Sequence, residues 1–97
     1  MNKVKGAFEQ EQVDESLTVI IPAYNEEVSI YGTVNSILIS RFLFIREIIV
    51  IDDGSTDFTG DLAFKAGARV IRHNRNRGYG ASLKTGIGSS TTTHILT

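Results

Sequence analysis

The chain has 97 residues, a formal net charge of −1, 41% hydrophobic residues and 22% charged residues. This balance excludes the global basic field that draws proteins to nucleic acid or to anionic membranes, and the length suits one small domain or part of a larger one. The sequence contains no cysteine, which excludes disulfides, cysteine-ligated zinc and a cysteine nucleophile and fits a cytoplasmic protein.

Residues 1–16 are polar and lack the apolar segment that a signal peptide needs. No apolar stretch approaches the roughly 20 residues that span a bilayer. We therefore expect residues 1–16 to be a polar, flexible lead-in and residues 17–97 to form a folded unit.

Four short runs rich in apolar and β-branched residues predict strands. They cover residues 17–21, 47–51, 68–72 and 94–97. Pro22 is expected to end the first strand, and Asp52 and Asp53 follow the second. Nearly continuous apolar strands are typical of a parallel sheet, which is buried on both faces.

The segments between these runs predict helices over residues 26–40, 58–65 and 80–89. Asn25 is the expected cap of the first helix and Asp57 that of the second, while Gly67 is its expected stop. The apolar positions expected to face the core are Val28, Tyr31, Val34 and Leu38 in the first helix and Leu83 and Ile87 in the third.

Strands that alternate with helices imply right-handed crossovers and a parallel sheet with helices on both faces. We predict a Rossmann-like α/β fold with strand order 3-2-1-4. Ligands bind such sheets at the carboxyl ends of the strands, near the point where the strand order reverses. Three segments therefore become candidates for a binding site: residues 22–26, 52–57 and 74–81.

The first two segments place aromatic and acidic side chains at strand ends. The ring of Tyr24 can pack on a nucleobase and the Glu26 carboxylate can hold ribose hydroxyls, although a packed tyrosine and a helix start explain them equally well. Asp52 and Asp53 at the end of a buried strand need partners. A base imide N–H, a ribose hydroxyl or an arginine would serve. Gly54 permits a tight turn.

The third segment is rich in glycine and arginine. Gly78 and Gly80 let a ligand approach the backbone, and the following helix presents free N–H groups to a phosphate. Arg75 and Arg77 could neutralise a diphosphate, with a solvated surface cluster as the alternative. The segment matches neither the dinucleotide-binding fingerprint nor the P-loop, and neither histidine of the chain has metal-ligand spacing.

Together the three segments resemble the inverting GT-A glycosyltransferases of the large family that includes dolichyl-phosphate mannose synthase, bacterial polyprenyl-phosphate sugar transferases and cellulose synthase. The motifs that carry the resemblance are VIIPAYNEE at 19–27, IVIDDGSTD at 49–57 and NRGYGA at 76–81. It covers nearly the whole chain from residue 17 onward, and it implies the nucleotide-binding half of a GT-A fold that takes a UDP- or GDP-sugar as donor.

The resemblance also implies individual roles. Asp53 would accept a hydrogen bond from the base imide N–H, while Asp52 supports the turn from beneath. The residues expected to line the donor site are Pro22, Ala23 and Tyr24 at the nucleobase, Glu26 at the ribose, Ile51 and Asp53 facing the base, and Gly78 and Gly80 beside the nucleoside and diphosphate.

In the family, the strand that corresponds to the one beginning at His94 is followed by an Asp-x-Asp motif that holds Mg²⁺ or Mn²⁺. The acceptor site and the general base come later in the sequence. This chain ends at Thr97. We therefore expect the full-length protein to be a glycosyltransferase whose acceptor is a polyprenyl phosphate, another lipid phosphate or a glycan, with membrane attachment left open. The 97-residue chain alone is expected to hold no metal, to transfer no sugar and to self-associate through the edge strand 94–97.

Two other functions compete with this interpretation. A stand-alone nucleotide-binding or regulatory module would share the same strand-end motifs. A nicotinamide-dependent dehydrogenase is disfavoured, because no Gly-x-Gly-x-x-Gly follows the first strand.

Overall fold

The computed structural model describes residues 17–40, 45–92 and 94–97. The expected lead-in at 1–16 lies outside these ranges. The described elements are β1 (Leu17–Ala23), α2 (Ile30–Leu38), β2 (Ile45–Asp53), α3 (Thr59–Ala66), β3 (Arg69–His73), α4 (Tyr79–Ser89) and β4 (His94–Leu96).

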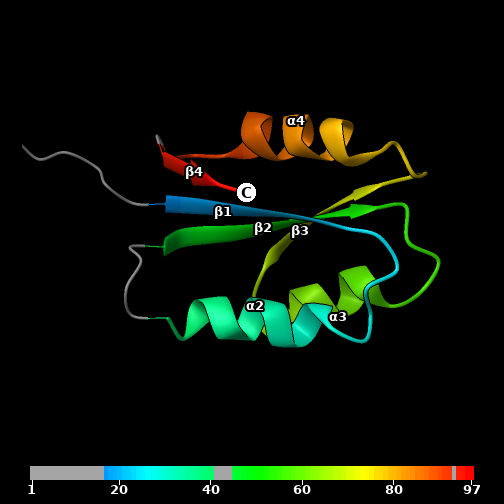
Figure 1. Cartoon of the computed structure of the whole chain (residues 1–97), viewed down its shortest axis with the longest axis horizontal. Helices are drawn as coiled ribbons and strands as arrows, with labels where there is room; N and C mark the ends of the chain where they lie inside the picture. The colour runs from blue at the N-terminus through cyan, green and yellow to red at the C-terminus, as the bar shows by residue number, and fades with distance from the viewer. Residues whose placement is uncertain (1–16, 41–44, 93) are drawn as a thin grey trace, which may run out of the picture.

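Within these ranges the strands form one parallel sheet in the order β3-β2-β1-β4, which confirms the predicted fold class and strand order. Helices α2 and α3 cover one face of the sheet and α4 covers the other, as Figure 1 shows. The carboxyl ends of β1, β2 and β3 therefore lie along one edge of the sheet, from which loops lead to all three helices.

The sheet has a hydrophobic core on each face. The central strand β2 contributes to both, because its successive side chains point to opposite faces. Ile48 and Val50 join the core beneath α2 and α3, whereas Ile49 and Ile51 join the core beneath α4. All four side chains are at most 3% exposed. The same alternation continues into the two acidic residues at the end of the strand, where it sends Asp52 and Asp53 to opposite faces.

The first strand is longer than predicted, because Pro22 lies inside it and pairs in register with Ile51. Strand β4 pairs with β1 at residues 17–19. The expectation that Pro22 ends the strand was wrong, since the strand expected over 17–21 runs two residues further, to Ala23.

Helix α2 begins four residues later than predicted. Residues 26–29 form a turn in which Ser29 and Ile30 both donate their N–H to the Glu26 carbonyl. Asn25 does not cap the helix, since its φ is 51° and its side-chain oxygen accepts the Thr56 N–H at 2.9 Å. The helix buries Ile30 and Val34, while the expected core residues Val28, Tyr31 and Leu38 are exposed.

Helices α3 and α4 begin and end within one residue of the predicted positions. Gly67 closes α3 with a φ of 112°, and the N-cap position is Phe58 rather than the expected Asp57. The Asp57 carboxylate nevertheless accepts the Thr59 N–H at 3.0 Å. Leu83 packs on the core beneath α4. Ile87, however, is 51% exposed; Gly86 takes the inward position instead, which lets the helix approach the sheet.

We expect Gly86→Ala to destabilise the fold, because an added Cβ would lie 2.5 Å from Cγ2 of Ile20. Overpacking of this kind costs about 1–3 kcal/mol, which outweighs the gain of about 1 kcal/mol in helix propensity. Gly88→Ala on the same helix is the matched control, since its Cβ would meet nothing within 4 Å. Urea unfolding should show the first variant weakened and the second slightly strengthened; equal effects would contradict the packing argument.

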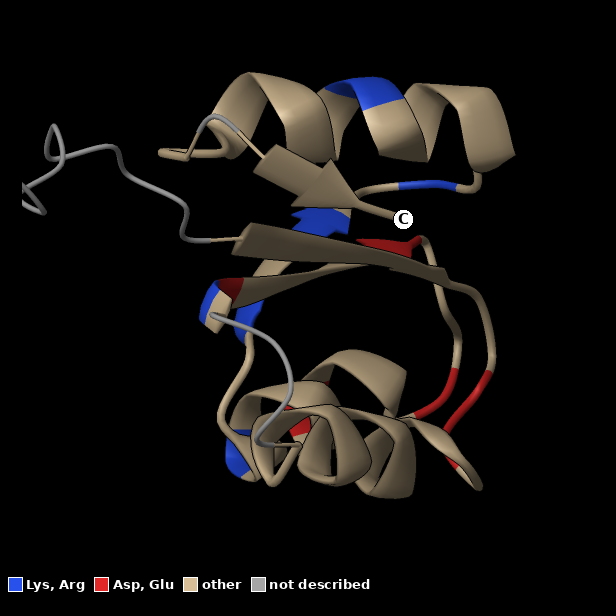
Figure 2. Ribbon diagram, turned by 60° about the vertical axis from the view of Figure 1, so that its left-hand side comes forward, with Lys and Arg blue, Asp and Glu red and all other residues tan. Residues whose placement is uncertain are grey.

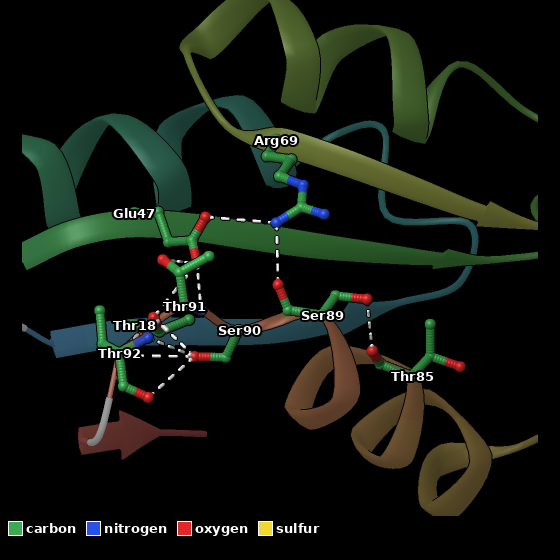
Figure 3. A network of polar contacts seen from close by, with 8 residues as sticks. All are labelled: Thr18, Glu47, Arg69, Thr85, Ser89, Ser90, Thr91 and Thr92. Carbon is green, nitrogen blue, oxygen red and sulfur yellow. Dashed lines mark hydrogen bonds and ion pairs between the residues drawn. The ribbon is translucent and has the colours of Figure 1, made fainter.

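A polar network fastens the segment after α4 to the amino ends of the sheet strands (Figure 3). The buried Thr18 hydroxyl bonds Thr92 at 2.7 Å and Ser90 at 3.0 Å. Glu47 accepts the Thr91 N–H at 3.2 Å, and Arg69 donates to the Ser89 carbonyl at 2.9 Å. These bonds hold the crossover that returns the chain to β1 and so help fix the strand order.

Candidate functional site

A pocket of about 200 Å³ lies where the carboxyl ends of β1 and β2 meet the start of α4. This is the sheet edge at which doubly wound folds bind ligands. Its volume is below the 300–1,000 Å³ typical of drug-sized ligands, so it suits a single ring system rather than a whole sugar nucleotide. The lining residues are Pro22, Ala23, Tyr24, Asp53, Asn76, Gly78, Tyr79 and Ser82.

Asp53 is the buried acidic residue of this pocket, and its hydrogen bonds fix the loop that leads into α4. Its carboxylate accepts the backbone N–H groups of Arg77 and Gly78, each at 2.9 Å. It also bonds Nδ1 of His73 at 2.7 Å, which sits directly opposite on β3. The loop between β3 and α4 is therefore fixed to the end of β2 by one side chain.

Burial by itself would raise the pKa of Asp53, but the hydrogen bonds from His73, Arg77 and Gly78 outweigh it and hold that pKa below its usual value. The second ring nitrogen of His73 bonds the Thr85 hydroxyl at 2.8 Å. That hydroxyl also donates to the Ala81 carbonyl. Asp53, His73 and Thr85 therefore form a chain of hydrogen bonds that links β2, β3 and α4.

Asp52 points to the other face of the sheet and supports the turn from beneath, as expected. Its carboxylate is fully buried and accepts the Ser55 N–H and Nε of Arg72, both at 3.0 Å. Gly60 leaves room for this ion pair, since a Cβ there would lie 2.5 Å from the Asp52 carboxylate. The arginine partner considered for Asp52 is therefore present, and it is Arg72.

The loops that follow β1 and β2 are joined by their polar groups. Asn25 donates its N–H to the Ser55 hydroxyl at 2.9 Å, and Glu26 donates its N–H to the Thr59 hydroxyl at 2.8 Å. Many polar groups of these two segments therefore bond to one another within the protein.

Burial would raise the pKa of Asp57 in the second loop, but hydrogen bonds, chiefly from Thr59, lower that pKa.

Gly54 lets the second loop pass close to the third. Its φ is 79°, and an added Cβ would lie 2.4 Å from backbone atoms of Arg75 and Asn76. The Asn76 side chain donates to the Asp53 carbonyl at 3.3 Å. The tight turn expected at Gly54 is therefore present, and it also seats the glycine-rich loop against β2.

Five of the eight residues proposed from sequence for the donor site line the pocket: Pro22, Ala23, Tyr24, Asp53 and Gly78. The other three do not line it. Glu26 is exposed in the turn before α2, Ile51 is fully buried in the core beneath α4, and Gly80 is exposed in the first turn of α4.

The sequence did not single out three further lining residues as ligand contacts: Asn76, Tyr79 and Ser82. The first two belong to the glycine-rich segment, whose proximity to the pocket could have indicated them. Ser82 carries no signal in the sequence, because its inward position depends on the angle at which α4 crosses the sheet.

The four arginines between residues 69 and 77 divide into two groups. Arg69 and Arg72 form ion pairs with acidic residues of the fold. Arg75 and Arg77 are exposed and, within the described ranges, enter no ion pair. In Figure 2, basic residues lie on the loop leading into α4, while acidic residues lie on the loops leading to α2 and α3.

A second hollow, of about 290 Å³, lies at the opposite, amino-terminal end of β2 between Leu38, Glu47 and Arg69. Parallel sheets of this kind bind their ligands at the carboxyl ends of the strands, not at that end.

In the ranges the structure describes, no three His, Asp or Glu side chains gather as metal ligands. No helix in those ranges is both long and apolar enough to cross a membrane.

The family model of glycosyl transferase family 2 matches residues 18–97. The chain belongs to glycosyl transferase family 2. Proteins similar to this chain include the glucosyl-3-phosphoglycerate synthase of Mycobacterium tuberculosis, 38% identical over 66 residues, covering 68% of this chain and 20% of that protein. Human dolichyl-phosphate beta-glucosyltransferase is 36% identical over 98 aligned positions, covering 84% of this chain and 30% of that protein.

The fold of this family 2 chain is also found in a solved structure. The M. tuberculosis glucosyl-3-phosphoglycerate synthase in complex with Mn²⁺, uridine diphosphate and glucosyl-3-phosphoglycerate matches with a TM-score of 0.74 and 29% identity, over 84% of this chain and 32% of that one. The chain spans about a third or less of the length of the curated relatives it matches.

Proposed function

We propose that the pocket at the ends of β1 and β2 binds the nucleoside part of a UDP- or GDP-sugar, and that the full-length protein is an inverting glycosyltransferase. The observation that carries this proposal is the meeting of three distant segments in one pocket, through Tyr24, Asp53 and Gly78. Family membership supports the same conclusion, as does the uridine diphosphate in the related M. tuberculosis structure.

The lining suits a nucleobase. Tyr24 is 46% exposed, so part of its ring is free to pack on another ring. Oδ2 of Asp53 accepts one hydrogen bond, from Gly78, and a carboxylate oxygen has a second lone pair for an imide N–H. In this proposal Ile51 supports the base site from below, and the exposed Glu26 meets the ribose outside the pocket.

The start of α4 suits the diphosphate. Gly80 is exposed, and a Cβ there would meet nothing within 4 Å, so packing within the described ranges gives no reason for glycine in this helix. Glycine costs about 1 kcal/mol relative to alanine inside a helix. Close approach of a ligand to the free N–H groups supplies a reason, and exposed Arg77 is next to this turn in the sequence.

Related structures contain Mn²⁺ or Mg²⁺ together with UDP, and a divalent metal offsets charge on a leaving diphosphate. The described residues offer no ligand set for such an ion. We therefore propose that other parts of the full-length protein bind it. We further propose that the 97-residue chain transfers no sugar by itself and self-associates through β4, where Ile95 and Leu96 are exposed.

The acceptor is a separate proposal. The names of the relatives point to phosphoglycerate for one and to dolichyl phosphate for another, and both acceptors carry a phosphate. We propose a lipid phosphate such as a polyprenyl phosphate, with a glycan as the alternative, and a cytoplasmic location for the donor site.

Calorimetric titration of the chain with UDP, GDP and NADH tests the donor proposal. We expect UDP or GDP to bind and NADH to bind at least tenfold more weakly, because the pocket accommodates a base and the dinucleotide fingerprint is absent. Binding of NADH alone, or of none of the three compounds, would refute the proposal.

The same titration, repeated with a variant of Arg77, tests the proposed contact between this arginine and the diphosphate. Arg77→Ala should weaken UDP binding while leaving uridine binding unchanged, since only UDP carries the diphosphate. Added salt should narrow the difference between the unchanged chain and the variant. Arg69→Ala is the control, because Arg69 is held by Glu47 and Ser89 at the other end of the sheet. If Arg77→Ala weakens both ligands equally, or neither, the arginine does not contact phosphate.

A further inference from the structure

Ser82 presents an unsatisfied hydroxyl at the pocket. The residue is fully buried and lines the pocket. Among the residues that the structure describes, its Oγ is the buried side-chain polar atom that has no hydrogen-bond partner. Buried polar groups are nearly always satisfied in native proteins, and each exception calls for an explanation.

The other hydroxyl residues of α4 show that local satisfaction is available. Thr85 donates to the Ala81 carbonyl at 3.1 Å, and Ser89 donates to the Thr85 carbonyl at 2.8 Å. Each bonds the carbonyl one helical turn back, as hydroxyl residues in helices commonly do. Ser82 makes no such bond, although its own N–H donates to the Gly78 carbonyl. Its hydroxyl is therefore left for a group that the described residues do not supply.

We propose that Ser82 is a specificity residue that donates its hydroxyl hydrogen to a carbonyl oxygen of the donor nucleobase. This inference rests on the proposed function and deepens it. Asp53 lines the same pocket with a free acceptor position. An acceptor and a donor lining one pocket match a base edge that carries an N–H next to a C=O, as in uracil or guanine. Cytosine and adenine present a ring nitrogen acceptor to the Asp53 carboxylate and mismatch it, so they do not bring their neighbouring group to Ser82 in the same register.

Ser82→Ala separates this role from a structural one. Because the hydroxyl has no partner, its removal should leave the thermal midpoint of the ligand-free chain unchanged or raise it. UDP binding measured by calorimetry should weaken about three- to tenfold, the usual effect of one neutral hydrogen bond. CDP binding should change less, so that the preference for UDP over CDP shrinks.

Ser89→Ala is the matched control, since it removes a hydroxyl from the same helix outside the pocket and should leave both affinities unchanged. A lowered thermal midpoint for Ser82→Ala would overturn the inference, because it would reveal a partner within the protein. Equal losses for UDP and CDP would place the contact on the ribose or phosphates and overturn it as well. Unchanged UDP binding refutes this inference alone, whereas failure of the unchanged chain to bind UDP or GDP refutes the proposed function and this inference with it.

Discussion

Replacing Asp53 with alanine is expected to cost about 3 kcal/mol or more of folding free energy, because each buried donor left without an acceptor costs about 1–3 kcal/mol. The His73 side chain is 5% exposed and would lose the acceptor that Nδ1 contacts at 2.7 Å. The N–H groups of Arg77 and Gly78 would lose the acceptor that fixes their loop. For a domain of ordinary stability, about 5–15 kcal/mol, this leaves a marginal fold.

Urea unfolding followed by circular dichroism measures this loss. Asp61→Ala is the matched control, since Asp61 is exposed and its ion pair with Arg72 is 3.8 Å long; exposed pairs contribute about 0–1 kcal/mol. The double variant Asp53→Ala/His73→Leu should recover part of the stability, because no buried imidazole is left without its hydrogen-bond partner. A loss below about 1 kcal/mol for Asp53→Ala would show that the pair does not stabilise the loop.

The same pair gives the stability a pH dependence of known sign. Since the folded-state pKa of Asp53 is lowered, the folded state binds fewer protons than the unfolded one when the pH is near that pKa. The contribution of Asp53 is therefore complete above the unfolded-state pKa of about 3.9 and is lost as pH falls through the folded-state pKa. In the Asp53→Asn variant, the free energy of unfolding should therefore fall less steeply as the pH is lowered through the acid range.

The fold could be predicted from the sequence because its main signals are local and redundant. Apolar β-branched runs, separated by helical segments, fix the element order, and the handedness of crossovers restricts the topology. The predictions that failed concern the end of β1, the start of α2 and the faces of the helices. Val28 and Ile87 are apolar and suitably spaced, yet both are exposed, because a turn before α2 and an inward glycine in α4 set which faces meet the sheet.

The candidate site was only partly predictable, for a different reason. The resemblance assigned Asp52 to the turn and Asp53 to the base site, and strand alternation sends the two side chains to opposite faces of the sheet. Polarity at strand ends is less informative. Asn25 and Glu27 belong to the first strand-end motif, but they bond the loop after β2. Ser82 was missed because an unsatisfied hydroxyl is visible only once every neighbour is placed.

Gly54→Ala is expected to be as damaging as the loss of Asp53, through backbone rather than charge. At a φ of 79°, an alanine carries conformational strain of about 1–3 kcal/mol. Its Cβ would also lie 2.4 Å from the backbone of Arg75 and Asn76, and relief of such an overlap costs about 1–3 kcal/mol more. Backbone atoms cannot rotate away as a side chain does, so the glycine-rich loop itself must move.

Gly78→Ala separates the two costs, because Gly78 also has a positive φ, of 99°, while its added Cβ would meet nothing within 4 Å. Urea unfolding should show a loss of about 1–3 kcal/mol for Gly78→Ala, from strain alone, and a larger loss for Gly54→Ala. Because displacement of the loop carries Asn76 away from the pocket, UDP binding to folded Gly54→Ala should fall more than tenfold. Equal stability losses for the two variants would show that the loop yields freely and that Gly54 does not seat it; unchanged UDP affinity would show that the position of the loop is irrelevant to the donor.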